Sequence, residues 1–442
     1  MLIVYNESII LIDAARHQIR AAIRALRMGG IMKPDSKQRP AFPGRLPLEK
    51  PTDRPLSAAM QRLYDMWTPL QDPGNPFYTV FKYSPVTGIG LDESELSVSR
   101  RDPSKVLKIG DTYYVWYTRR ATKHMPVGRF NIDQGDDETP IVDWDLADIC
   151  YATSNDGFNW VEQGVAVPRA PKGNYGDRSL STPDILVHGG RYYLYYQCFT
   201  TMWRQNDCVN VSMAWSDSPD GPWTRLERPV VEQGAEGAWD SCAIHDPYPL
   251  VYQGKIWVYY KGSPQDKSPG NLLRAQGVAI ADSPEGPYIK SELNPVTNSG
   301  HETMLWPYEE GIAALLIQDG PEKDTIQYAP DGLNFVPKAH VQLSPHAPGP
   351  FCPDAFADNG DGRGINWGLS HIIPQTPNTN NGLYIVRFDC ALSRDAARPE
   401  FKGSNLHWHE ASWFQPAVRL SEEWRERILA EQAALDRPTI GT

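Results

Sequence analysis

The sequence repeats one pattern five times between about residue 98 and residue 395. Each copy begins with an acidic residue and continues with a short apolar strand, a turn and a second apolar or aromatic strand. The acids that open the copies are Asp102, Asp184, Asp246, Glu302 and Asp354, at intervals of 82, 62, 56 and 52 residues. Such an interval holds four short strands with their loops, the size of one propeller blade. We therefore predict an all-β fold, a five-bladed β-propeller.

Turn signals separate the strands within each copy. Gly110, Gly190 and Gly254 stand between the first and second strands of three copies. A strand followed by a tight turn and an aromatic residue comes later in four copies, as ICYATSNDGFNW, VSMAWSDSPDGPW, VAIADSPEGPY and TIQYAPDGLNF. The D-G and S-P-x-G-P pieces favour tight turns between strands. This patterning excludes a helical solenoid, and a sandwich or jelly roll would not explain a recurring acid.

The flanks of the repeat differ in character from its centre. Residues 56–67 place apolar side chains at helical spacing behind a capping Ser57, and residues 8–28 are typical of a basic amphipathic helix. A C-terminal helix is expected to start at Ser421 and should stop before Pro438. We expect a helical N-terminal extension over residues 1–70, a propeller domain over 71–420, and a C-terminal helix and tail over 421–442.

Charge and composition exclude several classes of partner. The formal net charge of −11 repels phosphate backbones, so nucleic acid is not an expected partner. No apolar run reaches the roughly 20 residues that a membrane helix needs, so no membrane is expected either. The apolar residues 9–12 are followed by the arginines rather than preceded by them, which is the reverse of a secretory signal. The six cysteines form no C-x-x-C pair. We expect a cytoplasmic protein with reduced thiols.

The recurring acids indicate where chemistry is expected. The innermost strand of every propeller blade lines one central channel, so acids at the same innermost position point into a shared space. Carboxyl groups held close together repel as anions, and their pKa values split so that one group keeps its proton. An ionised carboxylate beside a protonated one is the pair that glycoside hydrolysis uses. An Asp beside a proline also caps turns, which is the structural explanation for any one of these acids taken alone.

Other residues are candidates for substrate contact. His245 and His301 each precede one of the acids, and a histidine there either donates protons or only hydrogen-bonds the neighbouring carboxylate. Trp203 and Trp239 are candidate sugar platforms, although tryptophan also serves the core. Arg119, in the exit of the first copy, is placed to reach a substrate oxygen. Asp184 completes the predicted substrate-binding set.

Metal binding is the rival explanation of clustered Asp, Glu and His residues. The sequence has no H-E-x-x-H motif and no EF-hand loop, so we assign no metal ligands. We expect no cofactor to be required, and a hydrated divalent cation held near the channel carboxylates is the alternative.

Three motifs together resemble glycoside hydrolase family 117: SRRDPSK at residues 99–105, HDPYP at 245–249 and HETMLWP at 301–307. The similarity extends over about residues 56–420. The resemblance implies a five-bladed propeller with a helical N-terminal extension and a homodimer that exchanges its N-terminal helices. It also implies an exo-acting glycosidase that releases terminal 3,6-anhydro-L-galactose from neoagarobiose or neoagaro-oligosaccharides during agar degradation.

The resemblance also implies roles at the site. Asp102 matches the general base, Asp246 a carboxylate that tunes pKa and orients the sugar, and Glu302 the third essential acid. His301 matches a histidine proposed as general acid, and we expect it to deliver the proton while Glu302 positions it and shares the proton. The implied mechanism is inverting, which predicts about 6.5–9.5 Å between acid and base.

Two other functions stay open from the sequence. One is a different propeller glycosidase, of the α-L-arabinofuranosidase or β-xylosidase type, in which the glutamate is expected in the third blade. Glu302 opens the fourth copy instead, which favours the first interpretation. The other is a propeller that binds sugar without cleaving it.

Overall fold

The computed structural model describes residues 76–392 except 96, 129, 203–208, 237, 264–274, 321, 358–363 and 374–381, together with 49, 50, 52, 53 and 430. The propeller belongs to the unit Leu56–Thr442. Apart from residue 430, the described helical residues form two 3₁₀ helices, η2 (Glu93–Glu95) and η3 (Ile132–Gln134). No described helix is both long and apolar enough to cross a membrane. The predicted terminal helices, and the dimer through the N-terminal ones, fall almost wholly outside these residues and stay predictions.

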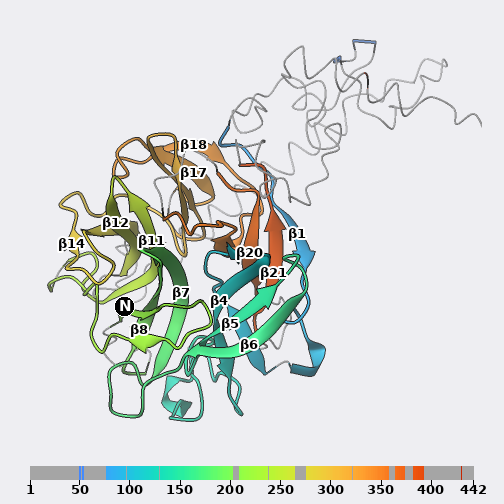
Figure 1. Ribbon diagram of the computed structural model, residues 1–442. Helices are drawn as coiled ribbons and strands as arrows, with labels where there is room; N and C mark the ends of the chain where they lie inside the picture. Colours follow the sequence, from blue (N-terminus) through green and yellow to red (C-terminus); the bar gives the residue numbers. More distant parts are fainter. Residues whose placement is uncertain are drawn as a thin grey trace, which may run out of the picture. The chain divides into compact units, whose positions relative to one another are not determined.

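The described strands form five antiparallel sheets arranged around a centre, which confirms the predicted five-bladed propeller (Figure 1). Blade one contains β2 (Val98–Arg101), β3 (Leu107–Ile109), β4 (Thr112–Ala121), β5 (Asp148–Ser154) and β6 (Trp160–Val167). Blade two contains β7 (Ser179–His188), β8 (Arg191–Phe199), β9 (Asn210–Ser216) and β10 (Thr224–Arg225). Blade three contains β11 (Ala243–Tyr252), β12 (Lys255–Ser263), β13 (Ala275–Ala281) and β14 (Ile289–Lys290). Blade four contains β15 (Met304–Tyr308), β16 (Gly311–Leu316), β17 (Thr325–Ala329) and β18 (Val336–His340). Blade five contains β19 (His346–Pro350), β20 (Trp367–Ile372), β21 (Tyr384–Asp389) and β1 (Lys82–Pro85).

The ring is closed by a strand from the other end of the propeller sequence. β1 pairs antiparallel with β21, with Lys82 opposite Asp389 and Pro85 opposite Val386. β1 is thereby the outermost strand of blade five, whose other three strands come about 260 to 300 residues later. Closure removes the unpaired edge that an open stack of sheets would leave.

The predicted turns are confirmed. Gly110, Gly190 and Gly254 adopt positive φ values of 62°, 81° and 72° in the β3–β4, β7–β8 and β11–β12 hairpins, a conformation that glycine reaches without steric cost. In the outer hairpin of blade one, the carboxylate of Asp156 accepts the backbone N–H groups of Phe158 and Asn159 at 2.8 and 2.7 Å. Side chains and glycines thus fix the loop geometry that the repeat requires.

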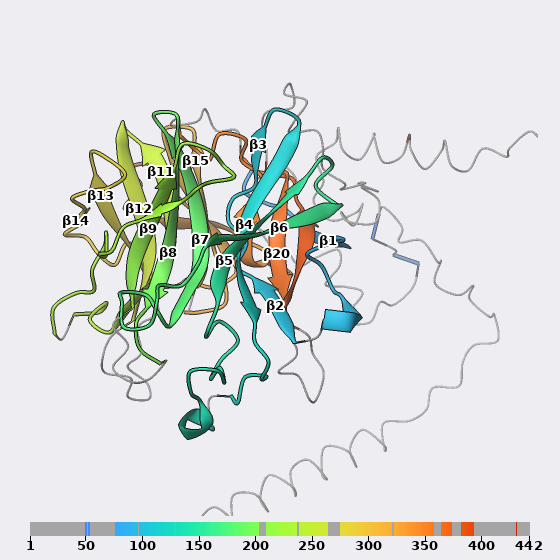
Figure 2. The ribbon, with the colours of Figure 1, turned by 60° about the horizontal axis from the view of Figure 1, so that its bottom comes forward.

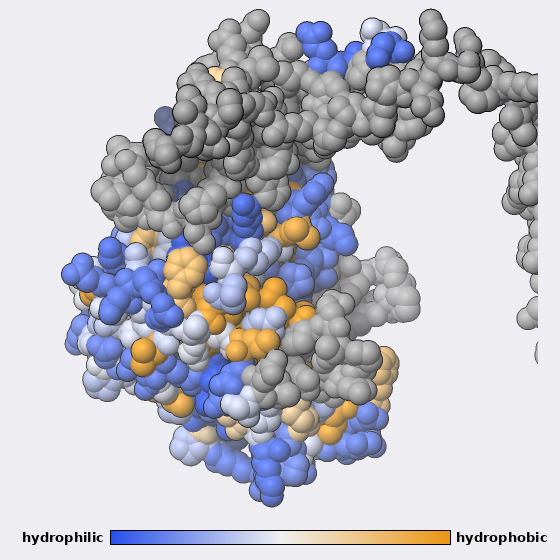
Figure 3. Space-filling model, turned by 90° about the vertical axis from the view of Figure 1, so that its right-hand side faces the viewer, coloured by the Kyte–Doolittle hydropathy of each residue, from blue (hydrophilic) through white to orange (hydrophobic). Residues whose placement is uncertain are grey.

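Apolar packing lies between neighbouring blades. One cluster joins blades three, four and five, and others join blades two and three, one and five, and one and two. The inner strands are buried almost throughout, whereas an outer strand such as β6 alternates and exposes Val161 and Val165. The side of the molecule seen in Figure 3 accordingly mixes hydrophilic and hydrophobic residues. The blades are therefore held to each other mainly by the hydrophobic effect.

Each blade has a residue with a positive φ at an equivalent place: within the innermost strand in blades two, three and five, between β2 and β3 in blade one, and just before β15 in blade four. These residues are Asp102, Thr182, Asp246, Glu302 and Ala347, with φ of 51°, 48°, 53°, 52° and 46°. Strand register shifts across three of them, between Ser181 and Asp184, His245 and Tyr248, and His346 and Gly349. In blade one the interruption separates β2 from β3. A bulge of this kind redirects one side chain of a strand.

The positions of the bulges show that two of the five repeated acids, Asp184 and Asp354, are not equivalent to the other three. The equivalent residue is Thr182 in blade two rather than Asp184, and Ala347 in blade five rather than Asp354. Asp354 lies in the turn after β19, where its Oδ1 accepts the N–H of Phe356 at 3.2 Å. The repeated feature is a backbone conformation, and an acid marks it in only three blades.

A buried ion pair joins three blades near the axis. Lys105, from blade one, contacts Oδ2 of Asp184 in blade two and donates to the carbonyl oxygen of Pro249 in blade three at 2.8 Å. Its Nζ also lies 4.1 Å from the ring centroid of Tyr248. Burial lowers the pKa of Lys105 and raises the pKa of Asp184, and the contact between the two opposes both shifts. Because every partner is supplied by another blade, the pair ties the blades together.

We expect replacement of Lys105 by methionine to lower the free energy of unfolding by about 3–5 kcal/mol, because the Asp184 carboxylate is left buried without its cation. Denaturant unfolding measures this loss. The double variant Lys105→Met/Asp184→Leu should recover much of it, since no buried charge is left. Lys255→Met, which removes the exposed partner of Asp282, is the control and should cost at most about 1 kcal/mol. A loss for Lys105→Met no greater than the control would contradict the role of the pair.

Candidate active site

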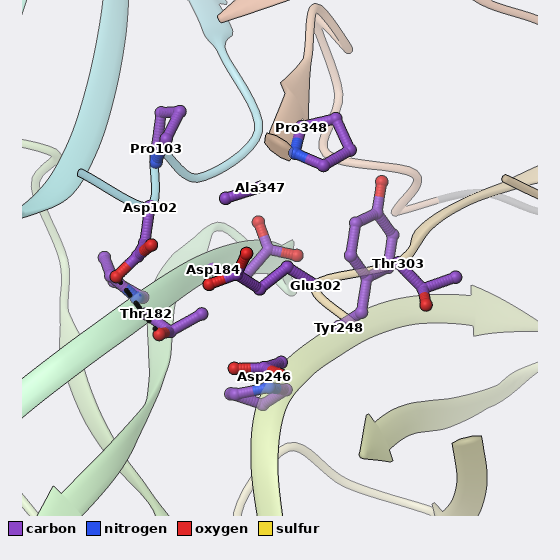
Figure 4. Close-up of a pocket in the computed structure, with 12 residues that line it drawn as sticks. Asp102, Pro103, Thr182, Asp184, Asp246, Tyr248, Glu302, Thr303, Ala347 and Pro348 are labelled. Carbon is purple, nitrogen blue, oxygen red and sulfur yellow. Dashed lines mark hydrogen bonds between the residues drawn. The ribbon is translucent and has the colours of Figure 1, made fainter. Parts of the chain in front are cut away.

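A pocket on the propeller axis is lined by all five blades (Figure 4). Its lining consists of the five bulge residues and their neighbours: Asp102, Pro103, Thr182, Pro183, Asp184, Asp246, Pro247, Tyr248, Glu302, Thr303, Ala347 and Pro348. The free volume of about 30 Å³ holds one or two water molecules but not a sugar ring. This pocket is therefore the floor of a site, and a substrate would lie above it.

Asp102 is buried and surrounded by donors. Arg101 Nε donates to its Oδ2 at 2.8 Å, and the hydroxyls of Thr118 and Thr182 donate to the same oxygen at 3.1 and 3.3 Å. His371 Nδ1, which accepts the backbone N–H of Asp102 at 3.3 Å, lies 3.2 Å from Oδ1. Burial alone would raise the pKa of Asp102, but Arg101 and His371 hold it well below its usual range. Asp102 is therefore an anion at neutral pH, as a general base must be.

Asp246 is the second ionised carboxylate. Lys261 Nζ lies 2.9 Å from its Oδ2, and His301 Nε2 lies 3.8 Å from the same atom. Burial would raise the pKa of Asp246, and the charge of Lys261, with smaller contributions from His301 and His245, lowers it below the usual value.

Glu302 has the opposite electrostatic environment. Arg101 Nη2 donates to its Oε1 at 3.3 Å, and Gln318 Nε2 donates to Oε2 at 3.4 Å. Burial, followed by the negative charges of Asp102 and Asp246, raises the pKa of Glu302 well above its usual value. Because Arg101 is already held by Asp102, it offsets only part of this effect. Glu302 therefore keeps its proton where the two aspartates have lost theirs.

His301 stands next to this proton and is more accessible. Its Nδ1 lies 2.9 Å from Oδ2 of Asp319, and its side chain is 30% exposed, against 6% for Glu302. Burial and the charge of Lys261 lower the pKa of His301, while the hydrogen bond to Asp319 opposes this. Ligand atoms of His301, Asp246 and Glu302 all lie within 4.8 Å of one another.

His245 is connected to Asp102 through two other side chains. His245 Nδ1 lies 2.7 Å from Oε1 of Gln197, Gln197 Nε2 hydrogen-bonds Oγ1 of Thr182, and that hydroxyl donates to Asp102. If the amide nitrogen of Gln197 donates to Thr182, its oxygen accepts from His245, which places a proton on Nδ1 of that histidine. The network orients His245 and Asp102 together.

Arg119 and Trp239, two predicted substrate contacts, do not line this pocket and have partners elsewhere in the blades. Arg119 does not line the pocket, because its neighbour Thr118 faces Asp102 and strand alternation sends Arg119 to the other face, where Nε lies 2.7 Å from Glu162. Trp239 stacks on Tyr260 with ring centroids 5.7 Å apart. It covers Gly262 so closely that a Cβ there would lie 2.0 Å from the indole.

The other substrate-binding predictions have different outcomes. Asp184 lines the pocket, but its carboxylate is taken by Lys105. His245 is joined to the site by Gln197, and Trp203 lies outside the described residues.

Sequence reasoning gave no role to Arg101, Lys261 or His371. Strand pairing offered a signal for Lys261, which is opposite His245 in the β11–β12 hairpin, whereas nothing local announces His371, which lies 269 residues from Asp102.

Among the described residues, two groups bring three metal-ligand atoms within 4.8 Å: Asp102, Glu302 and His371, and Asp246, His301 and Glu302. The groups share Glu302, and basic side chains already contact both aspartates. The donor set therefore fits a divalent cation poorly, because Arg101 and Lys261 supply the positive charge that the carboxylates need.

Comparisons with known proteins agree with this arrangement. The family model "Glycosyl hydrolases family 43" matches residues 94–276. A family 117 glycoside hydrolase, Zg3597 of the marine bacterium Zobellia galactanivorans, is 45% identical in sequence over 78% of this chain and 100% of its own, with a TM-score of 0.69. Two more distant structures share the fold: a BT0996 RGII complex, 11% identical over 72% of this chain and 94% of its own (TM-score 0.52), and a protein described as a glycoside hydrolase, 12% identical over 76% and 97% (TM-score 0.50). No curated protein matches the sequence.

The three motifs that carry the family resemblance meet in the axial pocket, each supplying one of the acids Asp102, Asp246 and Glu302. Together with the identity to Zg3597 over its full length, this shows that the chain is a glycosidase and belongs to glycoside hydrolase family 117.

Proposed function

We propose that the protein is an exo-acting glycosidase that releases terminal 3,6-anhydro-L-galactose from neoagarobiose or neoagaro-oligosaccharides. The observation that carries the proposal is the convergence of three carboxyl groups from blades one, three and four, with the pKa lowered at Asp102 and raised at Glu302. Beneath them Lys105 is buried against Asp184 and Tyr248, both of which line the pocket. The sugar itself rests on the three family motifs.

Asp102 is the proposed base, which takes a proton from the attacking water. Glu302 is the nearest protonated acid, but its oxygen lies within 4.8 Å of Asp102, closer than the roughly 6.5–9.5 Å that an inverting pair needs for a water between its members. His301 contacts the other side of the cluster, next to Asp246, and is the more exposed donor. We therefore keep His301 as the group that delivers the proton to the leaving oxygen, with Glu302 as the store that supplies it.

In this scheme Glu302 and His301 hold one proton between them. Asp319 binds Nδ1 of His301 and so directs Nε2 toward the carboxylates. Arg101 orients both Asp102 and Glu302, and Asp246 with Lys261 sets the charge beside His301. If the product instead retains its configuration, the short Asp102–Glu302 distance would assign Asp102 as nucleophile and Glu302 as acid/base.

A family 43-type activity, on α-L-arabinofuranosides or β-xylosides, is the second candidate. It is favoured by the family 43 model over residues 94–276. The place of the glutamate in blade four and the motif at residues 301–307 favour the first candidate.

We expect the enzyme to release 3,6-anhydro-L-galactose from neoagarobiose with inversion of configuration. NMR of the anomeric proton measures both the release and the configuration of the product. Asp102→Asn should lower kcat by about 10²–10⁴-fold without weakening substrate binding, because only the base is lost. Asp240→Asn is the matched control, since this buried aspartate pairs with Lys290 away from the pocket. Cleavage of arabinosides or xylosides in place of neoagarobiose would contradict the proposed substrate, and binding without any cleavage would contradict the reaction.

The pH profile should have asymmetric limbs. The lowered pKa of Asp102 keeps the base ionised into acid, so activity should fall only below about pH 4, the usual aspartate range. The raised pKa of Glu302 keeps the shared proton present into neutral solution, and activity is lost as pH rises through that pKa. Glu302→Gln should shift the alkaline limb to lower pH, because the remaining donor, His301, has a lowered pKa. An alkaline limb that does not move in this variant would rule out the proton store.

A chelator should leave the rate unchanged, because Arg101 and Lys261 already balance the aspartates that a cation would use. The assay compares kcat before and after EDTA treatment and after addition of Ca²⁺ or Mg²⁺. A loss that added cation restores would instead support a hydrated divalent ion near the channel.

A further inference from the structure

A second cavity, of about 550 Å³, lies beside blades one and two. This volume falls within the roughly 300–1,000 Å³ of typical ligand sites. The cavity is lined by Asp137, Leu146, Asp148, Arg169, Ala170, Lys172, Asp177, Arg178, Thr200, Thr201 and Met202. None of these residues lines the axial pocket, so this is a separate concavity.

The second cavity lies at the strand ends of blades one and two that are nearer to Asp102. Asp102 follows β2, the first strand of blade one. Asp148 is the first residue of β5, Arg178 directly precedes β7, and Thr200 directly follows β8, so all three lie at the strand ends that meet this face. The long β4–β5 loop, which carries η3, projects from this end (Figure 2). One ligand could therefore reach both cavities without crossing the propeller.

Four consecutive residues of the β4–β5 loop connect the two sites. Asp143 Oδ2 lies 3.7 Å from Nη1 of Arg101, the residue that joins Asp102 to Glu302. The Trp144 ring centroid lies 5.0 Å from Cζ of Arg101. Asp145 accepts a hydrogen bond from Arg178 Nε at 2.6 Å, and the next residue, Leu146, lines the second cavity. Three residue steps span at most about 10 Å, so the cavity begins close to the catalytic groups.

The chemistry of the lining favours a neutral, hydroxyl-rich ligand. Three acids (Asp137, Asp148, Asp177) face three bases (Arg169, Lys172, Arg178), so the lining has no net charge. Several of these charges are already paired, as in Arg169 Nε with Asp148 at 3.3 Å and Lys172 with Asp137. A balanced set of donors and acceptors suits sugar hydroxyls, which both donate and accept, and gives no advantage to a sulfated or phosphorylated ligand.

We propose that this cavity is a distal subsite that binds the reducing-end units of a neutral oligosaccharide while its non-reducing end is cleaved at the axial pocket. The proposal rests on the exo-acting function above. The cavity gives the enzyme affinity for chains longer than a disaccharide. The walls formed by the β4–β5 loop and by residues 169–178 hold the chain on both sides.

The test measures binding to protein carrying Asp102→Asn, which blocks turnover, by calorimetry with neoagarobiose, neoagarotetraose and neoagarohexaose. We expect the dissociation constant to fall about tenfold from the disaccharide to the hexasaccharide. Arg169→Met and Lys172→Met, each added separately, should abolish this gain and leave disaccharide binding unchanged. Arg191→Met, which removes an exposed arginine paired with Asp217 on the hairpin at the other end of blade two, is the matched control and should keep the gain.

The outcomes separate the subsite from the reaction. The subsite is overturned, and the reaction kept, if the unmodified enzyme cleaves the substrate but affinity does not rise with chain length. The same conclusion follows if the rise in affinity survives both variants. Length-dependent, Arg169-dependent binding without any cleavage by the unmodified enzyme keeps the subsite and overturns the reaction. Tighter binding of a sulfated oligosaccharide than of its neutral counterpart overturns the assignment of a neutral ligand.

Discussion

The positive-φ residue at an equivalent place in every blade, which forms a bulge in three of the innermost strands, is the constraint on which the site depends. Left-handed backbone costs of order 1–3 kcal/mol at a residue other than glycine, and here it recurs at five residues, including a threonine and an alanine. Because Thr182 and Ala347 adopt it without carrying a carboxylate, the bulge belongs to the blade and not to the acids. It turns one side chain per blade toward the axis, and that is how residues 200 positions apart in sequence become neighbours.

Unequal sharing of cations then gives the acids different protonation states. Among the described residues, the four acids that line the axial pocket have three close cations: Arg101 on Asp102, Lys105 on Asp184 and Lys261 on Asp246. Glu302 has only a share of Arg101, at 3.3 Å. Burial and the neighbouring anions therefore act on Glu302 with the least compensation, and it is the acid that retains a proton.

What the sequence could predict was local or periodic. The repeat predicts five blades, the turn glycines, and the acids at Asp102, Asp246 and Glu302. It misassigns the axial residues of blades two and five, where Thr182 and Ala347 take the place of the predicted acids. An acid can be recognised in a sequence, whereas a backbone angle cannot. Alternation along β4 places Arg119 on the strand face opposite to Thr118, the residue that hydrogen-bonds Asp102. The contacts of Asp102 with His371, and of Lys105 with Asp184, depend on ring closure and are beyond any local pattern.

The ionisation state of Asp102, the proposed base, consequently depends on closure of the ring. Blade one supplies Arg101 and Thr118, blade two supplies Thr182, and blade five supplies His371, all on one carboxylate. Blade five packs against blade one through a shared apolar cluster, and β1 completes its sheet. The packing and strand pairing that close the ring thus hold His371 beside Asp102, and they also fix the charge distribution on which acid/base chemistry at the axis would depend.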